Sequence, residues 1–103
     1  MKYRLEYIST FHTDIASVTS SLKEYPKMAK RIFEKMDAKL KNLTNLPEMY
    51  PIYDDFPDFR KLVIEDYLVF YSINKQAGII EVHRLIYGRM DVVNQLTMSA
   101  LEN

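Results

Sequence analysis

The chain has 103 residues, of which 48% are hydrophobic, and this composition suits one modest core and a single domain over residues 1–103. Fourteen basic side chains balance fourteen acidic ones, and a net charge of zero argues against a general nucleic-acid binder, whose affinity rests on neutralising phosphates. The sequence has no cysteine, which excludes disulfides and zinc–thiolate sites, and no apolar run of signal-peptide or bilayer length, so a cytoplasmic protein that avoids membranes is expected.

The first quarter of the chain predicts a strand followed by a helix. Residues 2–8 alternate apolar and polar side chains, as a strand with one buried face does. The helix that follows should run to about residue 25, and Thr10 or Thr13 is placed to cap its start. Pro26 ends that helix and suits the first turn of a second one.

The second helix carries the clearest pattern in the chain. Its apolar residues recur at helical spacing and form one stripe that should be buried: Ala29, Ile32, Phe33, Met36, Leu40 and Leu43. A break this short predicts an antiparallel helical hairpin. Residues 27–41 also carry six basic and two acidic side chains, whereas residues 48–58 carry four acidic ones and no basic one. Three interpretations are open: the two segments are simply two solvated charged faces, they attract each other inside the fold, or they face different partners.

The second half of the chain predicts three strands and a closing helix. A loop with three prolines, residues 45–58, precedes strands at 59–65, 67–73 and 79–87, and a helix follows to the end. The middle strand is apolar on both faces, as a central strand covered on both sides is. The predicted fold is α+β in the order β-α-α-β-β-β-α, with an antiparallel-rich sheet, the helical hairpin on one face and a short C-terminal helix.

Few residues form a recognisable catalytic or ligand motif. Ser9, His12 and Asp14 are the residue types of a nucleophilic triad, but triads are assembled from distant segments, and capping at a helix start accounts for these residues. Two histidines, no cysteine and two isolated glycines give no metal or phosphate-binding motif. No metal and no cofactor are therefore expected.

The stretch EVHRLIYGRMDVV, residues 81–93, begins as a strand and ends as a helix. Its Arg84 shares strand parity with the apolar Val82, so its charge must be paired or must open onto a cleft, because burying a bare charge is costly. Two interpretations remain: an ion pair with Glu65 or Asp66, or an anion-binding group on a concave sheet surface.

Other side chains near this strand are also candidates for function. His83 has an ordinary pKa near neutrality and suits a general acid, or it is a partly exposed structural residue. Arg60 and Lys61 point to opposite faces of their strand, so only one of them can share a surface with Arg84. Tyr87 is a core or edge aromatic, or it stacks on a base or donates a proton at the sheet edge.

The run FRKLVIEDYLVFYSIN, followed by IIEVHRLIYGRMD, resembles the RelE/ParE superfamily of type II toxin–antitoxin toxins. An Arg-Lys pair leads into a Tyr-rich strand, and an Arg-containing strand ends in a Gly-Arg-x-Asp turn. The opening strand, the helical hairpin and the Leu-Pro loop extend the resemblance over nearly the whole chain. It implies a growth-inhibiting toxin that a cognate antitoxin binds and silences. The candidate catalytic residues it implies, with His83 as a lesser one, are Arg60, Lys61, Arg84, Tyr87 and Arg89.

The resemblance implies one of two targets. RelE-like toxins enter the ribosome and cleave mRNA as metal-independent endoribonucleases, whereas ParE-like toxins inhibit DNA gyrase and are not nucleases. We expect the ribosome and mRNA, with DNA gyrase as the alternative and a non-toxic interaction domain as the alternative of another class. Against cleavage, Leu68 stands where the nucleases carry an arginine, and the tail MSALEN has no tyrosine or histidine. Asp91 is expected to orient Arg89 or to cap the last helix.

Overall fold

The computed structural model describes the backbone of residues 2–102 and the side chains of residues 2–98. Its elements in chain order are β1 (Arg4–Tyr7), α1 (Ser9–Ser21), α2 (Pro26–Leu43), β2 (Ile52–Tyr53), β3 (Phe56–Ile64), β4 (Tyr67–Asn74), β5 (Ile79–Tyr87) and α3 (Val92–Glu102). The predicted α+β order is confirmed with one addition. The short strand β2 forms inside the segment expected to be a loop, because it pairs with β3.

The five strands form one mixed sheet in the order β1-β5-β4-β3-β2. β1 pairs with β5 in parallel, and the other neighbouring strands pair antiparallel, so the sheet is antiparallel-rich as expected. β4 lies at the centre, and its Val69, Phe70 and Tyr71 are each 0% exposed. A strand with both faces covered reads as a continuous apolar run, and this is the pattern that predicted its place.

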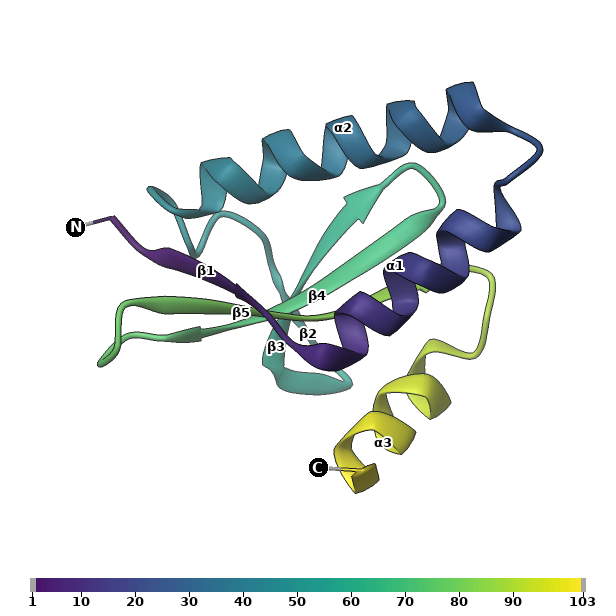
Figure 1. The fold of residues 1–103 in the computed structure, drawn as a ribbon. Coiled ribbons are helices and arrows are strands. Elements are labelled where there is room, and N and C mark those ends of the chain that lie inside the picture. The colour runs from purple at the N-terminus through teal and green to yellow at the C-terminus, as the bar shows by residue number, and fades with distance from the viewer. Residues whose placement is uncertain (1, 103) are drawn as a thin grey trace.

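The helices α1 and α2 run in opposite directions over one face of the sheet (Figure 1). Pro26 occupies the first turn of α2 as expected, and four residues of its predicted stripe are buried: Ile32, Met36, Leu40 and Leu43. Phe33 is only half-buried, although the same stripe predicted full burial. It lies beside the stripe rather than at its centre, on the flank of α2 that also carries Asp37 and Lys41.

The predicted cap of α1 is wrong. The helix starts at Ser9 directly after β1, its N-cap is Ile8, and no side chain caps it. Thr10 and Thr13 lie inside the helix, where Thr13 donates a hydrogen bond to the Ser9 carbonyl and Thr10 donates one to the His83 carbonyl. The chain passes from strand to helix through Ile8 alone, and an isoleucine side chain has no oxygen that could accept a backbone N–H of the first turn.

The opposite face of the sheet carries a smaller core under α3. Phe70, Ile86 and Leu96 are buried there, and Tyr53, Phe56, Phe59, Leu68 and Val92 pack against them. Val92 and Leu96 therefore contact the sheet at the predicted helical spacing. Ala100, the third residue of that pattern, has a side chain outside the described part of the chain.

Three basic side chains of α2 contact the end of β3 and the turn that follows it, whereas Lys30 and Lys41 pair with Glu34 and Asp37 of the same helix. Arg31 donates two hydrogen bonds of 2.8 and 2.9 Å to the Glu65 carboxylate, and Lys35 lies 3.2 Å from the same group. Lys39 donates a hydrogen bond to the Val63 carbonyl. In the acidic segment, Glu48 instead pairs with Lys75. Among the residues with described side chains, no ion pair joins the basic helix to the acidic segment, so the interpretation in which the two attract each other is not supported.

Candidate functional site

Strand β5 contains a β-bulge that changes which side chains share a face. Phe70 pairs with Arg84 but Tyr71 pairs with Val82, so His83 is an extra residue in β5. An extra residue shifts the two-residue alternation of a strand, and side chains on either side of it exchange faces. Val82 therefore points toward the helical hairpin, whereas Arg84 points with Phe70 toward the α3 face. The predicted shared face of Arg84 and Val82 is wrong.

Arg84 is paired inside the fold, as one of its two interpretations predicted, but not with Glu65 or Asp66. Its Nε lies 2.6 Å from Oδ2 of Asp14 and its Nη2 lies 3.0 Å from Oδ1. Its Nη1 donates a 3.1 Å hydrogen bond to the carbonyl of Gln95 in α3. The two charged side chains are only 13% and 14% exposed. Arg84 thus links α1, β5 and α3.

Helix α1 also covers the edge of β5 that β1 leaves open. The backbone N–H of Ile8 donates to the carbonyl of Val82, where β1 ends. Beyond that point the hydroxyl of Thr10 donates to the His83 carbonyl at 2.7 Å, and the carboxylate of Asp14 accepts the N–H of Leu85 at 2.9 Å. Side chains of α1 thus satisfy backbone groups that would otherwise be bare at a strand edge.

Arg60 and Lys61 lie on opposite faces of β3, as the sequence predicts. Arg60 pairs across the sheet with Tyr71 on the hairpin side, where its Nη1 donates to the Tyr50 carbonyl at 2.7 Å. Lys61 pairs across the sheet with Phe70 and therefore shares the α3 face with Arg84. Its Nζ lies 5.5 Å from the centre of the Tyr53 ring.

His83 occupies the bulge, where its ring contacts a hydroxyl and an aromatic ring. Its Nε2 lies 2.8 Å from the hydroxyl of Ser72, and its ring lies 4.9 Å from the ring of Phe59. Burial lowers the pKa of His83, and the charge of Glu81 opposes that shift. A lowered pKa keeps the imidazole neutral near pH 7, and this disfavours a role as a proton donor.

The other candidate residues lie at the end of β5 and in the turn after it, and each has a different environment. Tyr87 points toward the hairpin side and packs against Tyr67, with ring centres 5.5 Å apart. Gly88 follows, and a Cβ there would lie 3.0 Å from the Asp66 carbonyl that its N–H binds. Arg89 is exposed in the turn. Asp91 accepts the N–H of Asn94 and so caps α3, which confirms one of its two predicted roles.

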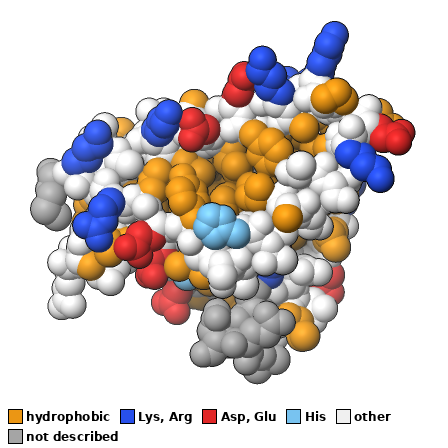
Figure 2. All heavy atoms as spheres, viewed as in Figure 1, with side chains coloured by type: hydrophobic (Ala, Val, Ile, Leu, Met, Phe, Trp, Pro, Cys, Tyr) orange, Lys and Arg blue, Asp and Glu red, His pale blue; other side chains and the backbone are white. Residues whose placement is uncertain are grey.

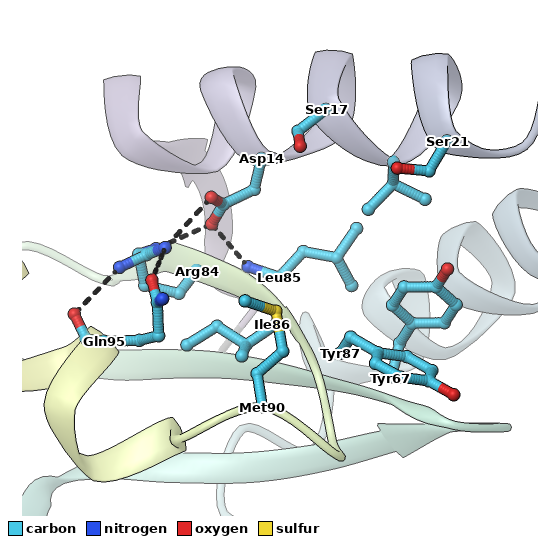
Figure 3. A pocket seen from close by; sticks show the side chains of 11 residues that line it. Asp14, Ser17, Ser21, Tyr67, Arg84, Leu85, Ile86, Tyr87, Met90 and Gln95 are labelled. Atoms are coloured by element: carbon cyan, nitrogen blue, oxygen red, sulfur yellow. Dashed lines mark hydrogen bonds and ion pairs between the residues drawn. The ribbon is translucent and has the colours of Figure 1, made fainter.

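A pocket of about 380 Å³ lies between α1, the end of β5 and the start of α3 (Figure 3). Its lining comprises Asp14, Ser17, Val18, Ser21, Tyr67, Arg84, Leu85, Ile86, Tyr87, Met90 and Gln95. The α1 residues Asp14, Ser17 and Ser21 recur at helical spacing and make one polar stripe, which was a signal available in the sequence. From the sequence alone Asp14 is predicted only as part of a triad or of a helix cap, and neither serine is predicted to line a site.

A hydrophobic hollow lies on the other side of α1, between α2 and the segment from β1 to α1, and we call it the α1–α2 hollow. Figure 2 shows hydrophobic side chains gathered there with charged side chains around them. Tyr7 is 39% exposed and stacks on Phe11, and the nearby charges of Asp37 and Lys41 act on the Tyr7 hydroxyl. Phe33 lies one helical turn before Asp37 on the same flank of α2 and is half-buried.

A family model described as the ParE toxin of the type II toxin–antitoxin system, parDE, matches residues 6–92. The chain belongs to the ParE toxin family. A chain of the toxin–antitoxin complex RelBE2 from Mycobacterium tuberculosis is similar in structure, with a TM-score of 0.61 and 13% identity over 84% of this chain and 99% of that one. The isolated E. coli RelE toxin also has a TM-score of 0.61 and 13% identity, over 96% and 98% of the two chains. No curated protein matches the sequence.

The chain is thus a type II toxin–antitoxin toxin of the RelE/ParE superfamily, and the two solved structures share its fold. In this ParE-family toxin the candidate residues do not converge on one surface. Arg60 and Tyr87 point to the hairpin side, Lys61 and Arg84 to the α3 face, and Arg89 lies in an exposed turn.

Among the residues with described side chains, no group of histidines and carboxylates can hold a metal ion. Within residues 2–102, no helix has the length and apolar character needed to cross a membrane.

Proposed function

We propose that this ParE-family toxin inhibits growth by binding a protein, DNA gyrase, and does not cut mRNA. The observation that carries this proposal is the engagement of the two strand arginines. The guanidinium of Arg84 donates hydrogen bonds to Asp14 and Gln95, and that of Arg60 donates one to the Tyr50 carbonyl. A nuclease that stabilises a phosphate transition state needs cations aimed at the substrate, and these two are aimed into the fold.

The charge of the chain supports the same conclusion. Its net charge is zero, and a protein that enters a phosphate-lined site gains affinity from strong positive charge. A toxin that docks on another protein has no such need. The proposal places the toxin in the cytoplasm, as one domain, because gyrase acts on the chromosome there.

We also propose that a cognate antitoxin silences the toxin by laying an amphipathic helix or extended segment in the α1–α2 hollow. Recognition of a partner helix by an apolar groove is a common mode of peptide binding, and Tyr7 and Phe33 provide such a surface. The basic residues on the far flank of α2, Arg31, Lys35 and Lys39, contact the end of β3 and the turn that follows it. Apolar contact, more than charge, should therefore determine antitoxin affinity.

The test compares the two activities with the same purified toxin. We expect inhibition of DNA supercoiling by gyrase, relieved by the antitoxin, and no cleavage of mRNA in a reconstituted translation reaction. Cleavage of mRNA on the ribosome, with supercoiling unaffected, would overturn the proposal.

The second candidate is ribosome-dependent mRNA cleavage, and one observation favours it. Lys61 and His83 lie on the same face of the sheet as Arg84, next to the aromatic ring of Phe59. A cation, an imidazole and an aromatic ring are the groups that bind and cut single-stranded RNA. Lys61→Ala separates the candidates, because it should abolish an mRNA-cleaving activity and leave gyrase inhibition intact.

A further inference from the structure

The pocket between α1, the end of β5 and the start of α3 has the paired charges, hydroxyl groups and aromatic wall of a ligand-binding site. It lies on the α3 side of α1 (Figure 3), whereas the α1–α2 hollow lies on the α2 side (Figure 2). An antitoxin in the hollow therefore leaves this pocket to another occupant. The inference about that occupant rests on the proposed function.

The lining of the pocket disfavours binding of a charged ligand. Its two charged lining residues, Asp14 and Arg84, neutralise each other in a pair that is almost buried. The other polar side chains are the amide of Gln95 and the hydroxyls of Ser17, Ser21, Tyr67 and Tyr87 (Figure 3). A charged ligand entering here would lose its hydration without meeting an unpaired opposite charge, which is unfavourable. An uncharged ligand with one hydrogen-bonding group finds hydroxyl partners.

The walls of the pocket favour an aromatic ring. The rings of Tyr67 and Tyr87 lie 5.5 Å apart at an angle of 59°, and the thioether of Met90 stands across from them. Aromatic rings pair well in tilted geometry, and a methionine sulfur contacts ring edges favourably. Pockets for drug-sized ligands hold about 300–1,000 Å³. A volume of about 380 Å³ therefore fits a single ring system rather than a large molecule.

We propose that this pocket receives an uncharged aromatic side chain, a tryptophan or tyrosine, from the protein that the toxin inhibits. A protein partner is favoured over a free small molecule because apolar surface continues outside the pocket. Met90, at the pocket wall, is 52% exposed, so part of its apolar side chain lies on the molecular surface beside the pocket. A buried aromatic anchor with apolar surroundings is the usual centre of a protein–protein interface.

The first experiment measures the chemistry of the pocket with small probes. Indole and p-cresol, which stand for the two side chains, are titrated into the full-length toxin while the methyl signal of Met90 is followed by NMR. Acetate and guanidinium serve as charged comparators. Ser17→Phe fills the pocket from α1, and Ser20→Phe is the matched control, an exposed serine on the same helix that does not line the pocket.

Saturable shifts with indole or p-cresol are expected in the wild type and in Ser20→Phe, with affinity at least about tenfold weaker in Ser17→Phe. Circular dichroism checks that both variants are folded. The proposal is overturned if neither aromatic probe binds, if the charged probes bind equally well, or if both variants weaken binding alike.

The second experiment tests the occupant by gyrase inhibition. Ser17→Phe should lose about tenfold or more in inhibitory potency while Ser20→Phe retains it. Equal inhibition by wild type and Ser17→Phe would overturn the assignment of the pocket to the target. If the wild type does not inhibit gyrase at all, the proposed function fails, and the probe titration still decides the selectivity of the pocket by itself.

Discussion

Arg84 and Asp14 stand 70 residues apart in the chain, yet their side chains meet in two hydrogen bonds of 2.6 and 3.0 Å. The same carboxylate accepts the N–H of Leu85, so Asp14 holds both a side chain and the backbone of β5. The pair therefore fixes α1 against the strand and, through Gln95, fixes α3 as well. Its first role is structural.

Removing one partner of this pair should be costly. Arg84→Ala leaves the Asp14 carboxylate buried without its cation, and we expect a loss of about 3–5 kcal/mol in the free energy of unfolding. Arg84→Lys should recover only part of it, because an ammonium cannot form the two-armed contact. Urea denaturation of both variants measures these losses. In a double-mutant cycle, Asp14→Leu with Arg84→Met should cost less than the sum of the two single changes, and strict additivity would contradict the coupling.

The two apolar positions of α2 should behave differently. Leu40 is 1% exposed, so Leu40→Ala should cost about 2–5 kcal/mol of stability, measured by thermal or urea unfolding. Phe33 is half-buried at the α1–α2 hollow, so Phe33→Ala should cost less stability and should weaken antitoxin binding, measured by titration calorimetry. If Phe33→Ala binds the antitoxin as tightly as the wild type, the hollow is not the antitoxin site.

Stability should depend on pH through Glu65. Hydrogen bonds from Arg31 and from Lys35 hold the pKa of Glu65 at about 2, below its ordinary value of 4.5. A depressed pKa in the folded state means that the stabilisation is fully present above about pH 4.5 and is lost as the pH falls toward 2. Urea unfolding at a series of pH values should show a weaker decline between these limits in Glu65→Gln. An identical decline in both proteins would contradict this role.

Glu65 also has an unusual backbone, which offers a second test of the same turn. Its φ is 53°, in the left-handed region that favours glycine or asparagine, and it sits at the turn between β3 and β4. Glu65→Asn should relieve the backbone strain and should also remove the ion pairs with Arg31 and Lys35. Its stability should therefore exceed that of Glu65→Ala, which loses the ion pairs and keeps the strain. Equal melting temperatures would argue against strain at this position.

Substitution of Arg89 should affect toxicity without affecting folding. It is exposed in the turn after Gly88, and among the residues with described side chains it forms no hydrogen bond or ion pair with the fold. Arg89→Ala should change stability by no more than about 0.5 kcal/mol. We expect reduced growth inhibition with antitoxin binding kept, and partial rescue by Arg89→Lys. Full toxicity of Arg89→Ala would exclude the strand exit from the toxic surface.

The sequence by itself determined the parts of this toxin that depend on local periodicity. The 3.6-residue stripe of α2 specified its buried face, and Pro26 specified where the helix begins. The apolar run of β4 placed that strand at the centre of the sheet. The opposite orientations of Arg60 and Lys61 followed in the same way from strand alternation.

Only the tertiary structure decided the arrangement around Arg84. The alternation rule assumes an unbroken strand, and the bulge at His83 breaks it, so the predicted face of Arg84 was wrong. The choice of Asp14 over Glu65 or Asp66 depends on β1 ending at Tyr7, which leaves the edge of β5 to α1. Both features arise from contacts between segments far apart in the chain. No periodicity within one segment records such contacts, because each depends on where the other segment folds.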